Sequence, residues 1–303
     1  MLPQKFKQRY RKIIPEFDKF LEFSKRQQSV SARVNTLKTS REEFLKGTKL
    51  KLREVPWYEN GFFVDGKQAA YVTNTLEYFL GYIYLQDAAS MIPPLVLDPQ
   101  ENERILDMTS APGSKTTQIA QMLNNRGCII ANDNSIQRIK ALRNNINRLG
   151  VLNVIITNFD SVRFPNSQFD KILLDVPCSL EGSMRKYFIT WNENIIRNFA
   201  GIQRRMIERA FHLLKPDGIL VYSTCTYAPE ENEGVVQHLM NRYDVEIERI
   251  KVKGLETHPG LERFRDTTYD PSIKKATRIY IHDYNTSGFF IAKIRKLKLW
   301  SRK

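Results

Sequence analysis

Residues 104–117 read RILDMTSAPGSKTT, and this stretch decides the fold class. Ile105 and Leu106 predict the end of a buried strand, which stops at Asp107 because small, turn-forming residues follow. Residues 114–123 then predict a helix. A strand, a tight turn and a helix form the opening unit of a doubly wound α/β domain, whose ligands bind at the carboxyl ends of the strands. The same pattern also occurs as an ordinary strand-to-helix turn without a ligand.

The loop in this unit indicates which ligands it suits. It lacks both the G-x-G-x-x-G fingerprint of dinucleotide sites and the G-x-x-x-x-G-K-[ST] phosphate loop. An acidic residue at the strand end, Asp107, suits a ligand that carries hydroxyls or a positive charge better than it suits a pyrophosphate. S-adenosylmethionine has both features, and we expect it as the cofactor.

Four acidic residues follow successive predicted strands: Asp107, Asp133, Asp160 and Asp175. In a parallel sheet, the four strand ends line one crevice. Asp133 is expected to accept hydrogen bonds from ribose hydroxyls, and Asp160 from an adenine amino group. A single Asp at such a place is more often a helix cap or a turn residue. Four in register with four strands favour a ligand that carries adenosine but no phosphates.

Charge and composition narrow the function classes. The 303 residues carry 47 Lys and Arg against 33 Asp and Glu, a net charge of +14, which favours a polyanionic partner such as nucleic acid or, alternatively, a solvated basic surface. No run of 18 apolar residues occurs, so we expect no membrane span. Three cysteines predict no disulfide framework and indicate a reducing compartment, the cytoplasm. Four histidines and no Cys-x-x-Cys pair predict no metal site.

The first 85 residues differ in pattern from the rest. Residues 1–28 predict amphipathic helices, and residues 31–85 predict a small α+β unit whose helix begins with a capping box of Ser40 and Glu43. Small β-sheets with aromatic and basic residues, as in RRM-like domains, are common RNA-binding platforms. Arg33 and Lys38 are candidate RNA contacts. A structural packing subdomain is the alternative. We therefore predict an N-terminal RNA-binding region over residues 1–85.

From residue 86 to 303, strands and helices alternate. This alternation predicts a Rossmann-like α/β domain with a mostly parallel sheet and helices on both faces. Further strands are predicted at 128–132, 154–157, 171–175 and 218–223, with helices at 135–149, within 191–214 and at 230–240, and closing strands at 245–252, 278–282 and 288–294.

Two cysteines follow predicted strands and should face the same crevice. Cys178 lies in the sequence DVPCS and Cys225 in the sequence STCT. A lone cysteine is usually a small buried hydrophobic residue, as we expect for Cys128. Two cysteines at the functional edge of the sheet favour thiol chemistry, in which a basic neighbour, with Lys115 as the candidate, lowers the pKa of the thiol.

These motifs, taken together, resemble the Nol1/Nop2/Sun family of RNA cytosine-5 methyltransferases, in a compact archaeal form. Three positions depart from the family pattern: Ser114 replaces a second glycine, Leu180 stands where glycine is common, and Thr226 stands where serine is frequent. The matching segments cover nearly the full chain in order: RVNTLK at 33–38, QDAAS at 86–90, DMTSAPGSKT at 107–116, DVPCS at 175–179, STCT at 223–226, ENE at 231–233 and SGFF at 287–290.

The resemblance implies an S-adenosylmethionine-dependent enzyme that forms 5-methylcytosine through a covalent bond from Cys225 to C6 of the base. It implies that Cys178 assists product release, that Asp175 contacts the N3/N4 edge of cytosine, and that Lys115 positions Asp175 or the base. We expect a cytoplasmic monomer with tRNA as first substrate and rRNA as the alternative. The implied cofactor contacts are Ser110, Ala111, Pro112, Gly113, Ser114, Lys115, Thr116, Asp133, Arg138, Asp160 and Asp175.

Two other readings stay open from the sequence. In DNA cytosine-5 methyltransferases the nucleophile lies in a Pro-Cys motif, which would make Cys178 the attacking residue. The small N-terminal unit and the STCT motif disfavour that class. The second alternative is an RNA-binding protein that has lost catalysis, which the intact Asp133, Cys178 and Cys225 disfavour.

Overall fold

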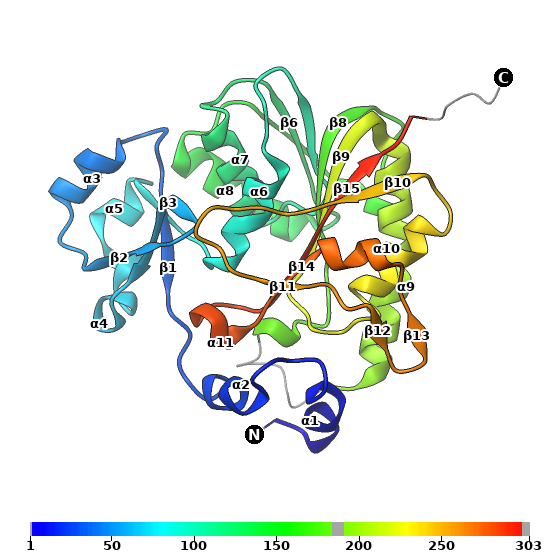
Figure 1. Cartoon of the computed structure of the whole chain (residues 1–303). Helices are drawn as coiled ribbons and strands as arrows, with labels where there is room; N and C mark the ends of the chain where they lie inside the picture. Colours follow the sequence, from blue (N-terminus) through cyan, green and yellow to red (C-terminus); the bar gives the residue numbers. More distant parts are fainter. Residues whose placement is uncertain (1, 184–190, 299–303) are drawn as a thin grey trace.

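The computed structural model describes residues 2–183 and 191–298, and a nine-stranded sheet forms its centre (Figure 1). Five parallel strands lie in the order β7-β6-β5-β8-β9, and β15 (Phe289–Lys296) pairs antiparallel with β9. The predicted Rossmann-like core with a mostly parallel sheet is confirmed. The parallel strands are β5 (Arg104–Asp107), β6 (Cys128–Asn132), β7 (Val154–Thr157), β8 (Phe169–Asp175) and β9 (Leu214–Thr224), and β10 (Val245–Glu248), β11 (His258–Pro259) and β14 (Thr277–Ile279) extend the β15 side.

Helices cover both faces of this sheet because neighbouring strand residues point to opposite sides. Ile105 belongs to the core under one set of helices and Leu106 to the core under the other. The first set comprises α6 (Ile92–Leu97), α7 (Ser114–Met122) and α8 (Ile136–Leu149), and the second comprises α9 (Glu193–Leu213) and α10 (Glu233–Met240). None of the helices within residues 2–183 and 191–298 combines the length and apolar character that a membrane span needs.

Local signals place most element boundaries close to their predicted positions. Helix α8 begins after Ser135, whose side chain accepts from the Arg138 amide, and ends at Gly150 in the left-handed conformation. The predicted strand 278–282 is wrong after residue 279. There the Asp283 carboxylate accepts from the Tyr280 amide at 2.8 Å and starts the short helix α11 (Ile281–Tyr284). The remaining short elements are η2 (Ala89–Met91), η3 (Ser161–Arg163), η4 (Glu181–Ser183), β12 (Arg263–Phe264), β13 (Thr267–Thr268) and η6 (Pro271–Lys275).

A second, four-stranded antiparallel sheet lies beside the first, with the order β2-β3-β1-β4 (Figure 1). Its chain order of strand, helix, two strands, helical segment and strand is that of RRM-like units. The predicted capping box is present: Ser40 and Glu43 exchange two hydrogen bonds of 3.1 Å. The elements are β1 (Ser31–Val34), α3 (Arg41–Gly47), β2 (Leu52–Val55), β3 (Tyr58–Val64), α4 (Gly66–Ala69), η1 (Val72–Asn74), α5 (Leu76–Phe79) and β4 (Ile83–Leu85).

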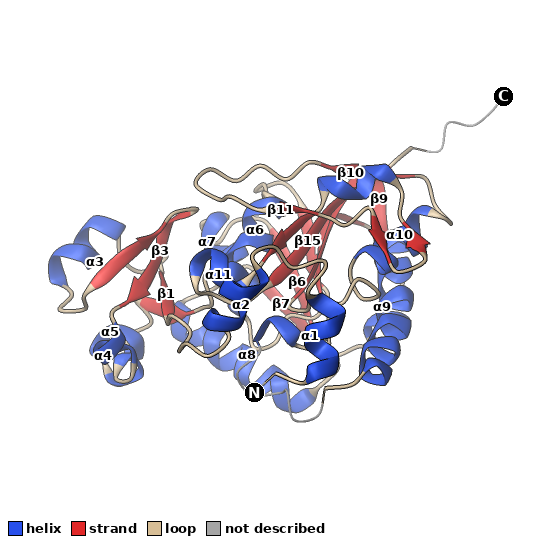
Figure 2. Cartoon of the chain, turned by 60° about the horizontal axis from the view of Figure 1, so that its bottom comes forward, coloured by secondary structure: helices blue, strands red, loops and turns tan. Residues whose placement is uncertain are grey.

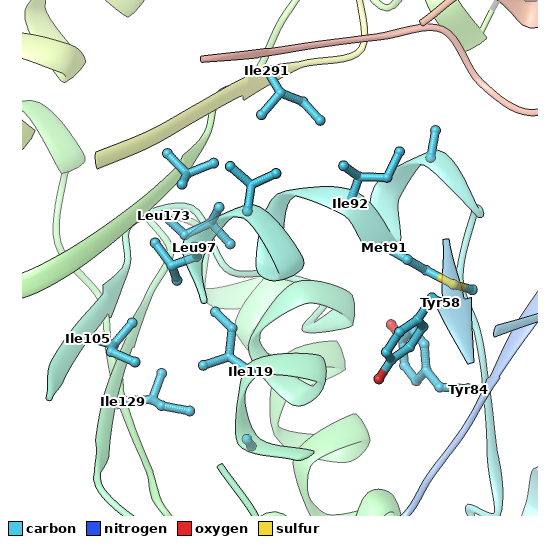
Figure 3. Packing of buried hydrophobic residues seen from close by; sticks show 14 of the residues in the cluster. Tyr58, Tyr84, Met91, Ile92, Leu97, Ile105, Ile119, Ile129, Leu173 and Ile291 are labelled. Carbon is cyan, nitrogen blue, oxygen red and sulfur yellow. The ribbon is translucent and has the colours of Figure 1, made fainter. Parts of the chain in front are cut away.

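Most residues on both faces of the small sheet are buried. Phe62 and its neighbours on one face pack against α3, through Phe44. Tyr58 and Tyr84 on the other face join the core of the larger domain, in one cluster with Ile119 of α7 (Figure 3). The aromatic residues of this sheet are therefore used for packing between the two parts of the chain, and RNA binding by residues 1–85 stays a prediction.

Arg33 is part of this packing and does not contact solvent, with 0 % of its surface exposed. Its guanidinium donates to Gln86 at 3.0 Å and to Thr117 of α7 at 2.8 Å, and it also donates to Gln121. The expectation that Arg33 contacts RNA is contradicted by this burial. Lys38 is exposed, but its amine already donates to the backbone carbonyls of residues 80 and 148.

The first two helices pack on the larger domain, although the small sheet follows them in the chain. They are α1 (Gln4–Tyr10) and α2 (Phe17–Phe23), and both lie below the central sheet in Figure 1 and in front in Figure 2. Tyr10 and Phe20 share one buried cluster with Tyr227, which follows β9, and Tyr280, which follows β14. The N-terminal helices therefore cover the end of the sheet where β9 ends.

We expect Arg33→Ala to lower the free energy of unfolding by about 1–3 kcal/mol, because it leaves buried acceptors on Gln86 and Gln121 without a donor. Denaturant unfolding measures this effect, with Lys67→Ala on exposed α4 as the control. A residue that contacts a phosphate would instead lower the salt dependence of RNA binding by about one unit of slope. A changed slope with unchanged stability would contradict the burial-based interpretation.

Candidate active site

Two buried carboxylates organise the loop between β5 and α7. Asp107, at the end of β5, accepts from the Thr116 hydroxyl at 2.6 Å, and burial raises the pKa of Asp107 to about 7. Asp133, after β6, accepts from the amides of Ala111 and Ser135 at 3.2 and 3.0 Å. Both side chains therefore hold the loop and the two helices that follow the strands, in addition to lining the strand ends as predicted.

Further polar contacts fix the loop from the side of α8. Arg138 pairs with Asp133 at 3.3 Å and donates to the Ala111 carbonyl, and Asn145 donates to the Pro112 carbonyl at 2.9 Å. Gly113 has φ of +106°, and a Cβ there would lie 2.9 Å from Leu142 of α8. Glycine is thus required at 113 but not at 114, where Ser114 is simply the first residue of helix α7.

Asp175, at the end of β8, is held by two partners. The Lys115 amine donates to it at 2.6 Å and the Ser223 hydroxyl at 2.7 Å. Lys115 also donates to Ser90 at 2.7 Å, so its recorded polar partners are an acid and a hydroxyl, not a cysteine. The predicted Lys115–Asp175 pair is present, whereas the sequence did not reveal Ser90 and Ser223 as its supports.

Asp160 differs from the other three strand-end acids because it is exposed. Its side chain caps η3 by accepting from the Val162 amide at 2.9 Å. Carboxylates at the ends of β6, β7 and β8 and a loop of few glycines fit the hydroxyls, the amino group and the positive sulfonium of S-adenosylmethionine better than a phosphate ligand.

The two cysteine sulfurs lie 3.2 Å apart, where β8 and β9 end. Cys178 is 4 % exposed, whereas Cys225 is partly exposed. The hydrogen bond to Cys225 and burial together raise the pKa of Cys178 well above that of an ordinary thiol. The raised pKa disfavours the thiolate of Cys178, and Cys225 is the more exposed of the two residues. Cys128 lies apart from them, partly buried at the start of β6.

Two residues near the sulfurs lie in segments that the sequence analysis named, but their roles were not predicted. Glu231 accepts from the Ser179 amide at 3.1 Å and from Gln203 at 2.8 Å, and burial raises the pKa of Glu231 to about 8. Leu180, at the position where glycine is common, adopts φ of +60°, a left-handed conformation that costs a leucine about 1 kcal/mol or more. In the part of the chain that the structure describes, no group of three His, Cys, Asp or Glu side chains could hold a metal ion.

Comparison with known proteins identifies the family. Residues 94–295 match the family described as 16S rRNA methyltransferase RsmB/F, and residues 2–88 match the N-terminal domain of 16S rRNA methyltransferase RsmF. The chain belongs to the RsmB/F family of RNA methyltransferases. This result confirms the predicted Nol1/Nop2/Sun resemblance and the predicted class, an RNA cytosine-5 methyltransferase that uses S-adenosylmethionine.

Members of the RsmB/F family with known names or structures resemble the chain over most of its length. The tRNA (cytosine(49)-C(5))-methyltransferase of Pyrococcus abyssi is 41 % identical, over 97 % of this chain and 96 % of that protein. The ribosomal RNA small subunit methyltransferase F of Vibrio atlanticus is 39 % identical over 98 % of this chain, which spans only 64 % of that protein.

Two solved structures share the fold. A methyltransferase homolog from Pyrococcus horikoshii has a TM-score of 0.86 and 39 % identity, over 97 % of this chain and 95 % of that one. NSun6 from the same organism, solved with SFG, an analogue of S-adenosylmethionine, has a TM-score of 0.85 and 28 % identity, over 98 % of both chains. The predicted cofactor is thereby confirmed for this family.

We expect Asp133→Ala to weaken S-adenosylmethionine binding by about 1–3 kcal/mol, the scale of hydrogen bonds to a charged acceptor. Titration calorimetry measures the affinity. Asp170→Ala is the matched control, because Asp170 pairs with Lys215 at the opposite end of β8. Equal affinity of the Asp133 variant and the unaltered chain would refute the assignment.

Proposed function

We propose that this RNA methyltransferase uses Cys225 as its nucleophile and Cys178 to assist product release. The observation that carries this proposal is the pair of sulfurs 3.2 Å apart, of which Cys178 is the buried one with the raised pKa. Cys225 adds its sulfur to C6 of cytosine, which breaks the aromatic system and makes C5 electron-rich. C5 takes up the methyl group, and loss of the C5 proton with cleavage of the carbon–sulfur bond restores the ring.

Asp175 is proposed to contact the N3/N4 edge of the cytosine, where charge changes as the sulfur adds to C6. The Lys115 amine and the Ser223 hydroxyl, at 2.6 and 2.7 Å, hold this carboxylate in one position. A group held in place before the reaction stabilises developing charge without reorganising. Lys115 therefore acts by positioning Asp175, which fits its contacts better than a role beside a thiol.

The cofactor, when bound, supplies an electrophilic methyl group. The residues proposed to hold it are the loop of residues 110–116 together with Asp133, Arg138, Asp160 and Asp175. Their chemistry supports this assignment, because exposed Asp160 and buried Asp133 follow neighbouring parallel strands. A cytosine within a duplex cannot enter such a crevice, so the target base must be unpaired or flipped out of its stack.

The alternative mechanism, in which Cys178 attacks as in DNA cytosine-5 methyltransferases, is disfavoured by two observations. Cys178 is the more buried of the two cysteines, and its pKa is raised, which reduces the thiolate form that attacks. An RNA-binding protein without catalysis is disfavoured because the Lys115–Asp175 pair and both thiols are intact.

We expect Cys225→Ala to lose nearly all methyl transfer and to form no covalent protein–RNA adduct. Cys178→Ala should still attack and methylate, then stall as an adduct that survives denaturing electrophoresis, because a carbon–sulfur bond does not depend on the fold. The double variant should show no adduct, and Cys128→Ala is the control cysteine. An adduct that persists in Cys225→Ala and is lost in Cys178→Ala would reverse the two roles.

A tRNA is the proposed substrate, with rRNA as the alternative. The chain matches the Pyrococcus abyssi tRNA enzyme over 96 % of that protein, whereas it spans 64 % of the Vibrio atlanticus rRNA enzyme.

We also propose that residues 1–85 contribute to RNA binding. The aromatic residues of the sheet are buried, so the contacts would come from exposed loops and helices, such as those that carry Tyr71, which is 67 % exposed, and Phe79, which is 76 % exposed. A cytoplasmic monomer with reduced cysteines completes the proposal.

Bisulfite sequencing of tRNA and rRNA from cells with and without the gene tests the substrate. We expect one or more cytosines in tRNA to lose protection from conversion when the gene is absent. Restoring the gene should restore protection, and a Cys225→Ala copy should not. Loss of protection in rRNA alone would replace the tRNA proposal with the rRNA alternative.

A further inference from the structure

A buried carboxylate that the reaction itself does not use lies between the two cysteine loops. Glu181 is 3 % exposed and follows Cys178 by three residues. Burial raises its pKa, yet four donors converge on its two oxygens, which favours the ionised form. The donors are the Tyr10 hydroxyl at 2.7 Å, the Trp191 indole at 2.6 Å, the Thr226 hydroxyl at 2.8 Å and the Tyr227 amide at 3.1 Å.

These contacts join the loop after β8 to the loop after β9. Thr226 follows Cys225 directly, and its hydroxyl lies 2.7 Å from the hydroxyl of Ser179, which follows Cys178 directly. A backbone bond runs parallel to this pair, from the Gly182 amide to the Cys225 carbonyl at 2.8 Å. These two contacts between the loops therefore help to hold the sulfurs at the separation that the β8–β9 register allows.

The loop after β8 needs such ties because its own conformation is unfavourable. Leu180, between Ser179 and Glu181, has φ of +60°, and a residue held in that region persists only where surrounding contacts determine it. The bond from Thr226 to Glu181 and the contact with Ser179 supply these contacts on both sides of Leu180.

Tyr10 brings the N-terminal helix α1 into this arrangement, 171 positions away in the sequence. The helix is anchored next to it, since Arg9 pairs with Glu193 at 3.1 Å and with Glu230 at 2.5 Å. The hydroxyl of Tyr10 bonds to both oxygens of Glu181 within a cluster of aromatic rings. Tyr10 can therefore orient the carboxylate of Glu181 from helix α1.

We propose that Glu181 is a positioning residue that keeps Cys178 and Cys225 at their working separation, and that Tyr10 completes this device from helix α1. The proposal rests on the roles given to the two cysteines above. It makes the N-terminal helices part of the catalytic arrangement, as a support for the thiol pair, in addition to any contact that they make with RNA.

Two pairs of matched variants test the proposal. Thr226→Val removes the bridging hydroxyl and Thr226→Ser keeps it. Tyr10→Phe removes the donor to Glu181, whereas Tyr280→Phe removes a hydroxyl of the same aromatic cluster that donates to the Ile13 carbonyl at 3.2 Å. A misplacement of about 1 Å can cost about 100-fold in rate, so we expect kcat to fall about tenfold or more in Thr226→Val and Tyr10→Phe.

The KM for RNA should stay unchanged in all four variants, and Thr226→Ser and Tyr280→Phe should keep the kcat of the unaltered chain. Thermal unfolding of each variant separates positioning from stability, because each test variant and its control should unfold within a few degrees of one another. Equal kcat within each pair, with Cys225→Ala still inactive, would overturn the proposal and leave the cysteine roles intact. Full activity of Cys225→Ala would instead overturn the cysteine roles.

Discussion

The pairing of β8 with β9 is the constraint on which the rest of the site depends. The two strands run parallel, and Asp175 lies opposite Ser223 at their ends. Cys178 and Cys225 follow this pair by at most three residues, so the register of the strands determines where both cysteines lie. A slip of one residue would turn Asp175 to the other face of the sheet and separate it from Lys115. The 3.2 Å between the sulfurs is thus a consequence of strand register, refined by contacts between the loops.

Buried polar side chains fix how segments that are distant in the sequence pack against one another, because hydrogen bonds are directional and hydrophobic contacts are not. Arg33 connects the small sheet to α7, the helix whose first turn contains Lys115, and Glu181 connects helix α1 to both cysteine loops. Such groups are costly when unpaired, so each specifies one arrangement of its partners. The crevice is therefore supported from two sides by segments that come first in the chain.

The sequence predicted local features well and long-range ones poorly. Strand-to-helix patterns located β5 through β9, and the capping box of Ser40 located α3, because these signals lie within a few residues of one another. Arg33 was misjudged because a basic residue in a strand gives no sign of burial until its partners on α7 are known. The contact of Tyr10 with Glu181 spans 171 positions, and no local pattern contains it.

The packing of α1 and α2 has a consequence for the order in which the molecule is built. Their aromatic residues are covered by Tyr227, Tyr280 and Ile281, so they find their partners more than 200 positions later in the chain. Contacts of such sequence separation form slowly and leave apolar surface open in the meantime. During synthesis, the support that α1 gives to the thiol pair can therefore form only after the residues around Tyr227 and Tyr280 have been made.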